Sequence, residues 1–188
     1  MPPPKKPEPT HRMVFTTNSL RNTTISVDDD ALYYEVVTRF WHPKLTKIFK
    51  LDKEAREMSL IAEIERPSGK GEEARVRFGG EHGAWMSEEE FLRWDEQKRG
   101  GTFTGGEGVE YRWKSHHRRL QLIRADDDDK SPLAKFHTHR RHFFVFRMSR
   151  HAFLEIKPEA TDAMDRLIMS YLLVERKRRN TSVIKPKS

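Results

Sequence analysis

The stretch AMDRLIMSYLLV, residues 163–174, is the part of the sequence that decides the fold. Nine of its twelve residues are apolar, and at helical spacing they cover about three quarters of the circumference. A surface helix has one apolar face, so a helix that is apolar nearly all round is enclosed by protein. It is too short to cross a bilayer, which takes about 20 apolar residues. We therefore expect a buried helix over Pro158–Arg179, with Asp165, Arg166 and Ser170 on a narrow polar stripe.

Most of the chain before this helix has the alternating pattern of β-strands. In residues 74–78 and 109–114, apolar residues alternate with charged ones, which places the two kinds on opposite faces of a sheet. Further strands are expected at Val14–Thr17, Thr23–Val27, Leu32–Thr38, Leu45–Leu51, Met58–Ile64, Thr102–Thr104, Leu120–Arg124, Leu133–His137, Phe143–Met148 and Ala152–Ile156.

One short helix interrupts the strands near residues 87–95. Ser87 and Glu90 have the spacing of a capping box, and Phe91, Leu92 and Trp94 follow as an apolar side. Runs of Gly, Pro and Asp separate the other segments, as expected for turns.

These patterns predict a mainly β fold of about twelve strands. Closure into a barrel manages the exposed edges of such a sheet. The side chains of the strands do not fill the interior of a barrel this large, and the apolar C-terminal helix is the obvious filling. We therefore expect a closed or nearly closed barrel around a buried hydrophobic C-terminal helix.

The length of 188 residues suits one domain with short tails. Residues 1–11 are rich in Pro and Lys and are expected to be disordered, residues 12–179 to form the domain, and residues 180–188 to be a flexible tail. The formal net charge of +7 favours anionic partners, such as nucleic acid or acidic lipid. It is equally compatible with a basic protein that has no such partner.

The chain contains no cysteine, which excludes disulfides, thiol catalysis and thiolate metal sites. The N-terminus lacks the apolar stretch of a signal peptide, and no segment has the length of a membrane span. We expect a protein that is not secreted and is intracellular, either cytoplasmic or peripheral to a membrane.

The chain resembles the tubby-like superfamily, which includes tubby C-terminal domains, phospholipid scramblases and plant LURP-one-related proteins. Within that group it is most similar to an uncharacterised fungal domain. The resemblance covers about residues 13–178 and is carried by short motifs in a fixed order: Phe15, Arg21-Asn22-Thr23, Leu32-Tyr33-Tyr34-Glu35-Val36, Ile61-Ala62-Glu63-Ile64, Thr102-Phe103, Tyr111-Arg112-Trp113-Lys114 and the helix from Asp162 to Val174.

This resemblance implies a twelve-stranded barrel around a hydrophobic helix and binding to membrane phospholipids, phosphoinositides in the tubby case. The lipid-binding basic residues of tubby have no one-to-one match here. The palmitoylation cysteines and the spanning helix of scramblases are absent, so scrambling activity is not implied.

Two basic clusters are the candidate site for an anionic headgroup. Its predicted residues are Lys114, His116, His117, Arg118, Arg119, His139, Arg140, Arg141 and His142. Arg147, Arg150 and the run Arg176–Arg179 are further basic positions. A combined patch would suit lipid phosphates or a nucleic-acid backbone. The alternative is that these are solvated turns that keep sheet edges from pairing, and cations at the end of a helix that stabilise it.

His137, His139 and His142 have a spacing that could hold a metal, but no fourth ligand is evident and a basic turn is the favoured interpretation. No catalytic motif is present, so neither an enzyme nor a cofactor is expected. The sequence favours a non-enzymatic binding module for anionic phospholipid headgroups at a membrane surface. The alternative is a protein- or nucleic-acid-binding module that uses the same basic faces.

Overall fold

A computed structural model describes residues 10–28, 31–67, 69, 73–116, 119–126, 132–137 and 152–183 of the chain. The strands are β1 His11–Phe15, β2 Thr23–Val27, β3 Leu32–Thr38, β4 Leu45–Asp52, β5 Glu57–Glu65, β6 Arg75–Phe78, β7 Met86–Ser87, β8 Arg93–Trp94, β9 Gly101–Thr104, β10 Glu110–His116, β11 Arg119–Arg124, β12 Ala134–His137 and β13 Phe153–Ile156. The helices are the 3-10 turns η1 Gly80–His82 and η2 Pro158–Ala163, and the α-helices α1 Glu88–Phe91 and α2 Met164–Val183.

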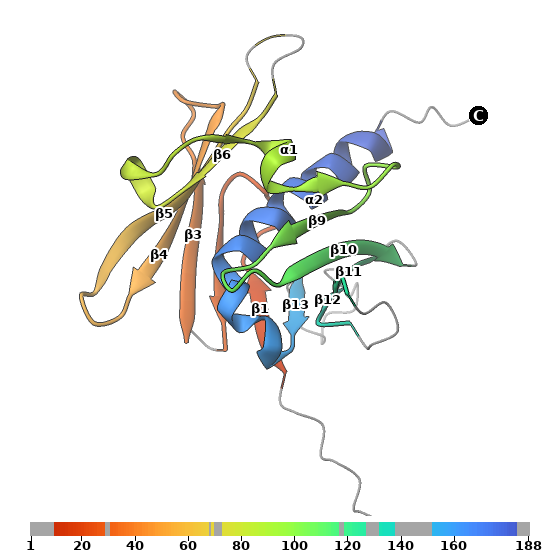
Figure 1. Cartoon of the computed structure of the whole chain (residues 1–188). Coiled ribbons are helices and arrows are strands. Elements are labelled where there is room, and N and C mark those ends of the chain that lie inside the picture. The colour runs from red at the N-terminus through yellow and green to blue at the C-terminus, as the bar shows by residue number, and fades with distance from the viewer. Residues whose placement is uncertain are drawn as a thin grey trace, which may run out of the picture.

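All described strands belong to one antiparallel sheet that wraps around α2 (Figure 1). The strand order is β7-β6-β5-β4-β3-β2-β1-β13-β12-β11-β10-β9-β8. β1 pairs with β13, and these are the first and last strands of the described residues; this pairing joins the two halves of the sheet. The prediction of a mainly β fold with a C-terminal helix is confirmed.

The sheet is not closed in the described residues, so a fully closed barrel, one of the two predicted forms, is not observed. β7 and β8 stand at the two ends of the strand order and do not pair with each other in the described residues. They are nevertheless neighbours in sequence, joined by the single turn of α1 and Leu92. The sheet therefore curls until its two ends lie on either side of α1, and we call this opening the seam.

The short helix is shorter than predicted. Ser87 is its N-cap, as expected, because the Ser87 hydroxyl accepts a hydrogen bond from the Glu90 backbone N–H at 3.0 Å. The predicted helix near residues 87–95 nevertheless ends at Phe91, since Leu92 is extended. Trp94 lies in β8 and pairs with Gly101 of β9. The pairing of β8 with β9 therefore prevents the helix from continuing beyond Phe91.

The predicted strands inside the described residues are all present, with ends shifted by a few residues. The predicted strand Phe143–Met148 lies outside the described residues. The described residues contain the other eleven predicted strands and two more, β7 and β8, of two residues each, which flank α1 and bring the described strands to thirteen. The C-terminal helical segment starts as a 3-10 turn at Pro158 and continues to Val183, beyond the predicted end at Arg179.

The burial of α2 confirms the central expectation. Every residue of α2 from Leu167 to Glu175 is buried, and Asp165 and Arg166 are half-buried on the polar stripe. Ser170 differs from the expected stripe, since it is fully buried. Its hydroxyl accepts a hydrogen bond from the Trp113 indole at 2.8 Å and donates one to the Leu167 carbonyl at 2.9 Å.

Two polar contacts fix α2 to opposite halves of the sheet. Trp113 of β10 bonds Ser170, and the Tyr34 hydroxyl of β3 donates to Asp165 at 2.7 Å. Lys50 of β4 also donates to Asp165, at 3.0 Å. These bonds set the rotation of the helix, which an apolar surface alone would leave weakly defined.

We expect Ser170→Ala to lower the free energy of unfolding by about 1–3 kcal/mol, because the buried Trp113 N–H loses its acceptor. Urea unfolding followed by tryptophan fluorescence measures this. The control is Thr181→Ala on the exposed side of the same helix, which should change stability by less than about 0.5 kcal/mol. Equal stability of the two variants would contradict the anchoring role of Ser170.

Candidate functional site

Part of the sequence-predicted basic cluster lies on the hairpin of β10 and β11. His116 pairs with Arg119 across the hairpin, and both are exposed, whereas Lys114 is half-buried. The remaining predicted residues lie outside the described residues: His117, Arg118, His139, Arg140, Arg141 and His142. The predicted union of the two clusters into one patch therefore stays a prediction.

His137, the first residue of the considered metal site, lies on β12. Its ring stacks on Phe153 at 4.4 Å between centroids, and Nε2 is 3.3 Å from a Glu155 carboxylate oxygen. Among the described side chains, no group of three or more is placed to hold a metal ion. His139 and His142 lie outside the described residues, so the described part of this cluster is one histidine that stacks on Phe153 and lies within hydrogen-bond distance of Glu155.

The basic run at the end of α2 divides into two parts with different surroundings. Arg178 and Arg179 both pair with Glu175, at 2.7 and 2.9 Å, and Arg179 also donates to the Asn18 carbonyl at 2.6 Å. Arg176 and Lys177 instead line a cavity. The run is therefore more than a stabilising helix end.

The turn between β3 and β4, residues 39–44, exposes two adjacent aromatic side chains. Phe40 is 85% exposed and Trp41 is 55% exposed, and their rings contact edge to face with 4.6 Å between centroids. The Arg39 guanidinium lies over Trp41, 5.4 Å from the ring centroid. His42 and Lys44 are also exposed. We call residues 39–44 the aromatic turn; it presents apolar surface and positive charge together.

Two arginines hold the aromatic turn from the body of the domain. Arg21 and Arg66 each donate a hydrogen bond to the Pro43 carbonyl, at 3.0 and 2.9 Å. Arg66 also donates to the Thr46 hydroxyl at 2.9 Å. The conformation of the turn is therefore fixed by charged hydrogen bonds, and its aromatic rings project without packing on the core.

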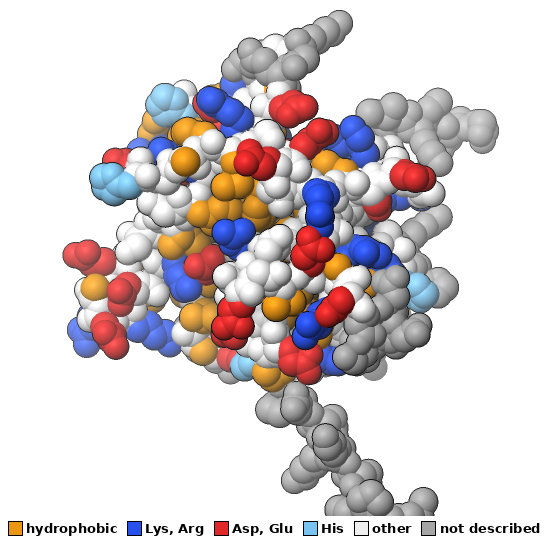
Figure 2. Space-filling model, viewed as in Figure 1, with side chains coloured by type: hydrophobic (Ala, Val, Ile, Leu, Met, Phe, Trp, Pro, Cys, Tyr) orange, Lys and Arg blue, Asp and Glu red, His pale blue; other side chains and the backbone are white. Residues whose placement is uncertain are grey.

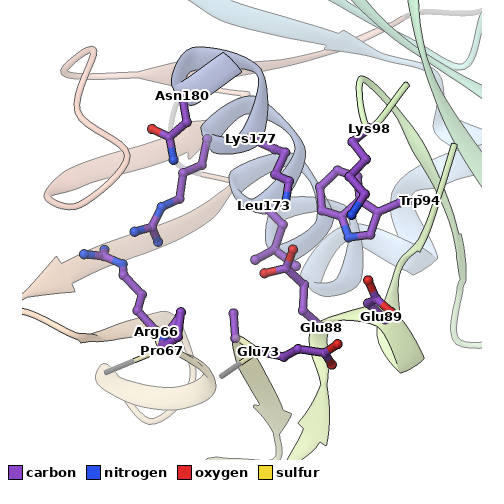
Figure 3. Close-up of a pocket in the computed structure, with 12 residues that line it drawn as sticks. Arg66, Pro67, Glu73, Glu88, Glu89, Trp94, Lys98, Leu173, Lys177 and Asn180 are labelled. Carbon is purple, nitrogen blue, oxygen red and sulfur yellow. The ribbon is translucent and has the colours of Figure 1, made fainter. Parts of the chain in front are cut away.

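A cavity of about 490 Å³ opens at the seam, beside the end of α2 (Figure 3). We call it the seam cavity. It is lined by Arg66, Pro67, Glu73, Ala74, Glu88, Glu89, Trp94, Lys98, Leu173, Arg176, Lys177 and Asn180. Leu173 is buried, whereas Glu73, Glu89 and Lys98 are exposed, so the cavity runs inward from the surface. Its lining comes from the residues that join β5 to β6, from α1 and the segment around β8, and from α2.

The aromatic turn and the seam cavity lie at the same end of the domain, since Arg66 contributes to both. Arg66 and Arg176 are close enough to repel. Burial, with the charges of Arg176 and Arg21, lowers the pKa of Arg66 to about 10. Burial and the charge of Arg21 also lower the pKa of Arg176, while Glu88 opposes this.

The face shown in Figure 2 carries no field of one sign. Lys and Arg side chains alternate there with Asp and Glu side chains around a central group of hydrophobic side chains. The net charge of +7 is therefore not concentrated on this face.

Sequence reasoning missed both the aromatic turn and the seam cavity. A signal for the turn was present: Phe40 and Trp41 are consecutive, follow the end of an alternating strand, and lie among basic residues. The cavity had no comparable signal, because Arg66, Glu88 and Arg176 are far apart in sequence.

Comparison with known proteins places this chain in a family but provides no annotated relative. A family of unknown function, DUF6593, matches residues 18–180. No curated protein and no solved structure matches the chain. In the described part of the chain, no helix combines the length and the apolar character that a bilayer crossing requires.

Proposed function

Since the chain belongs to the family of unknown function DUF6593, we propose a role from its own geometry: it is a non-enzymatic module that binds anionic phospholipid headgroups at a membrane surface. The observation that carries this proposal is the aromatic turn. Tryptophan, with its polar N–H edge, favours the interface between headgroups and acyl chains, and phenylalanine enters it as an apolar side chain. Trp41 and Phe40 are both exposed and available to enter it.

Positive charge around the turn supports an anionic surface over a neutral one. Arg39 and Lys44 flank the two rings, and Arg21 and Arg66 lie directly behind them. Each basic group near an acidic membrane contributes about 1 kcal/mol. The proposal covers phosphoinositides among the anionic headgroups. It also includes a second contact with the membrane, made by Lys114, His116 and Arg119.

We also propose that the chain is tubby-like and that its curled sheet is a nearly closed barrel of that kind. The antiparallel sheet around a buried C-terminal helix supports this, together with the position of the two sheet ends on either side of α1. In this proposal the protein is intracellular and peripheral to a membrane.

The test is sedimentation with vesicles of phosphatidylcholine, with and without phosphatidylglycerol. We expect binding that requires phosphatidylglycerol, and we expect Phe40→Ser combined with Trp41→Ser to weaken it about tenfold or more, because two interfacial side chains are lost. Folding should be unaffected, since both side chains are exposed.

The matched control is Met58→Ser, which removes an exposed hydrophobic side chain, 37% exposed, from β5. Equal sedimentation of the double variant and the control would contradict the role of the aromatic turn. Binding to double-stranded DNA that exceeds vesicle binding at matched salt would favour the nucleic-acid alternative instead.

A further inference from the structure

The seam cavity is lined by charged side chains of both signs. Arg66 and Asn180 lie on one side of it, and Glu73, Glu88 and Glu89 lie on the other with Trp94 (Figure 3). Four cations and three carboxylates line the cavity in total. In the part of the chain that the structure describes, no ion pair within 4.0 Å engages any of these seven groups. Such a set of unpaired opposite charges around a cavity is suited to a ligand that carries both signs.

Among the described residues, no carboxylate forms an ion pair with Arg66 or Arg176, although Glu88 attracts Arg176 from a longer distance. The Arg66 Nε is buried and has no hydrogen-bond partner among the described residues. The Arg176 guanidinium is half-buried and makes no hydrogen bond or ion pair there either. Two guanidinium groups that share a site repel each other, and a phosphate between them removes the repulsion. It can accept hydrogen bonds from Arg176 and from the second N–H of each Arg66 Nη, since the first is donated to Pro43 or Thr46.

The carboxylates that line the cavity outnumber the lysines beside them. The cavity lining contains three carboxylates and two lysines. The Lys177 ammonium group lies over the Trp94 ring, 5.5 Å from the ring centroid. Glu88 is half-buried, and its burial raises its pKa, which Lys177 and Arg176 oppose. Carboxylates beside an aromatic ring are a suitable environment for an ammonium group. The Lys177 ammonium group already lies beside Trp94. The negative charge of the three carboxylates is enough to bind a second ammonium group, one that belongs to a ligand.

We propose that the seam cavity binds a phosphate ester that also carries an ammonium group, with the phosphate at Arg66 and Arg176 and the ammonium at Glu88. This inference rests on the proposed function when the ligand is a lipid, since the phosphoserine headgroup has this chemistry and is anionic overall. A free phosphate ester has the same chemistry. The cavity takes the polar part of either, because charged residues outnumber the apolar Leu173, Ala74 and Pro67.

Other ligand classes fit the cavity less well. A simple anion would be repelled by the three carboxylates and would add no positive charge beside them. A simple cation would meet Arg66 and Arg176. A simple anion and a simple cation, each of which carries only one of the two charges, therefore serve as comparison ligands in the experiment.

The lipid arm compares vesicles of phosphatidylserine with vesicles of phosphatidylglycerol at equal content, because both are anionic and the first alone has an ammonium group. We expect about fivefold tighter binding to phosphatidylserine, the size of one partly exposed ion pair. Glu88→Gln should remove this preference, while Glu90→Gln, on the same helix turn and outside the cavity lining, should keep it.

The soluble arm measures the thermal unfolding midpoint with O-phosphoserine, glycerol 3-phosphate or ethanolamine. We expect O-phosphoserine to raise the midpoint most, because a ligand that binds the folded state stabilises it. Arg176→Gln should abolish the rise, and Arg99→Gln, exposed and outside the lining, should keep it.

The two proposals fail in different ways. Equal binding to the two vesicle types, with no advantage of O-phosphoserine over glycerol 3-phosphate, overturns the cavity assignment and leaves the aromatic turn as the membrane contact. A midpoint raised by O-phosphoserine without any vesicle binding supports the cavity with a soluble ligand and overturns the membrane role.

Discussion

Leu172→Asp is expected to abolish the folded state at ordinary temperatures. Leu172 is 2% exposed, in the part of α2 that is enclosed by the sheet. A carboxylate there loses its hydration without gaining a partner, which costs several kcal/mol, comparable with the total stability of a domain. Circular dichroism during thermal unfolding measures the loss of the cooperative transition.

The control for this variant is Thr181→Asp, which adds the same charge to the exposed side of α2. It should cost less than about 1 kcal/mol, even with a negative charge near the helix C-terminus. A Leu172→Asp protein that keeps the wild-type midpoint would show that α2 is not enclosed.

The second large effect is expected at Glu63, a carboxylate with no exposed surface. Arg77 of β6 forms an ion pair with it, and Lys47 of β4 lies 3.5 Å from its Oε1. The Arg77 guanidinium also lies over the ring of Trp85, 4.8 Å from its centroid. Glu63 thus depends on partners from the two neighbouring strands.

We expect Arg77→Met to lower the free energy of unfolding by about 3–5 kcal/mol, because it leaves a buried carboxylate without its main partner. Urea unfolding at neutral pH measures this. Adding Glu63→Leu to Arg77→Met should restore most of the loss, since an apolar pair replaces a buried ion pair with little net cost.

The matched control is Arg75→Met on the same strand. Arg75 forms an ion pair with Glu65, two residues along each strand from the pair of Arg77 and Glu63. The side chains of Arg75 and Glu65 are 55% and 39% exposed. A pair this exposed contributes about 0–1 kcal/mol. If Arg75→Met and Arg77→Met cost the same, burial is not what makes the Glu63 pair important.

The sequence by itself determined the elements of the fold. Alternation in Leu32–Thr38 and Glu110–His116 marks strands because successive side chains point to opposite faces. The apolar surface of residues 163–174 required an enclosed helix for a similar reason, since it depends on spacing within one segment. Ser87 was recognised as a cap because capping acts across three residues.

The tertiary structure decided what depends on contacts between distant segments. Trp94 was placed in a strand by pairing with Gly101, against its local helical pattern. Ser170 was buried because Trp113, from another segment, supplied a hydrogen bond. The basic residues at the end of α2 have two different environments. Arg178 and Arg179 form ion pairs with Glu175, whereas Arg176 lines the cavity.

The candidate site belongs to this second group. Arg66, Glu88 and Arg176 come from three segments, and the curl of the sheet brings them around one opening. No spacing along the chain encodes that arrangement, because the position of the sheet ends follows from the pairing of all the strands together. The sequence thus specified the sheet and the helix, while the tertiary packing of the sheet around the helix specified the cavity and its charges.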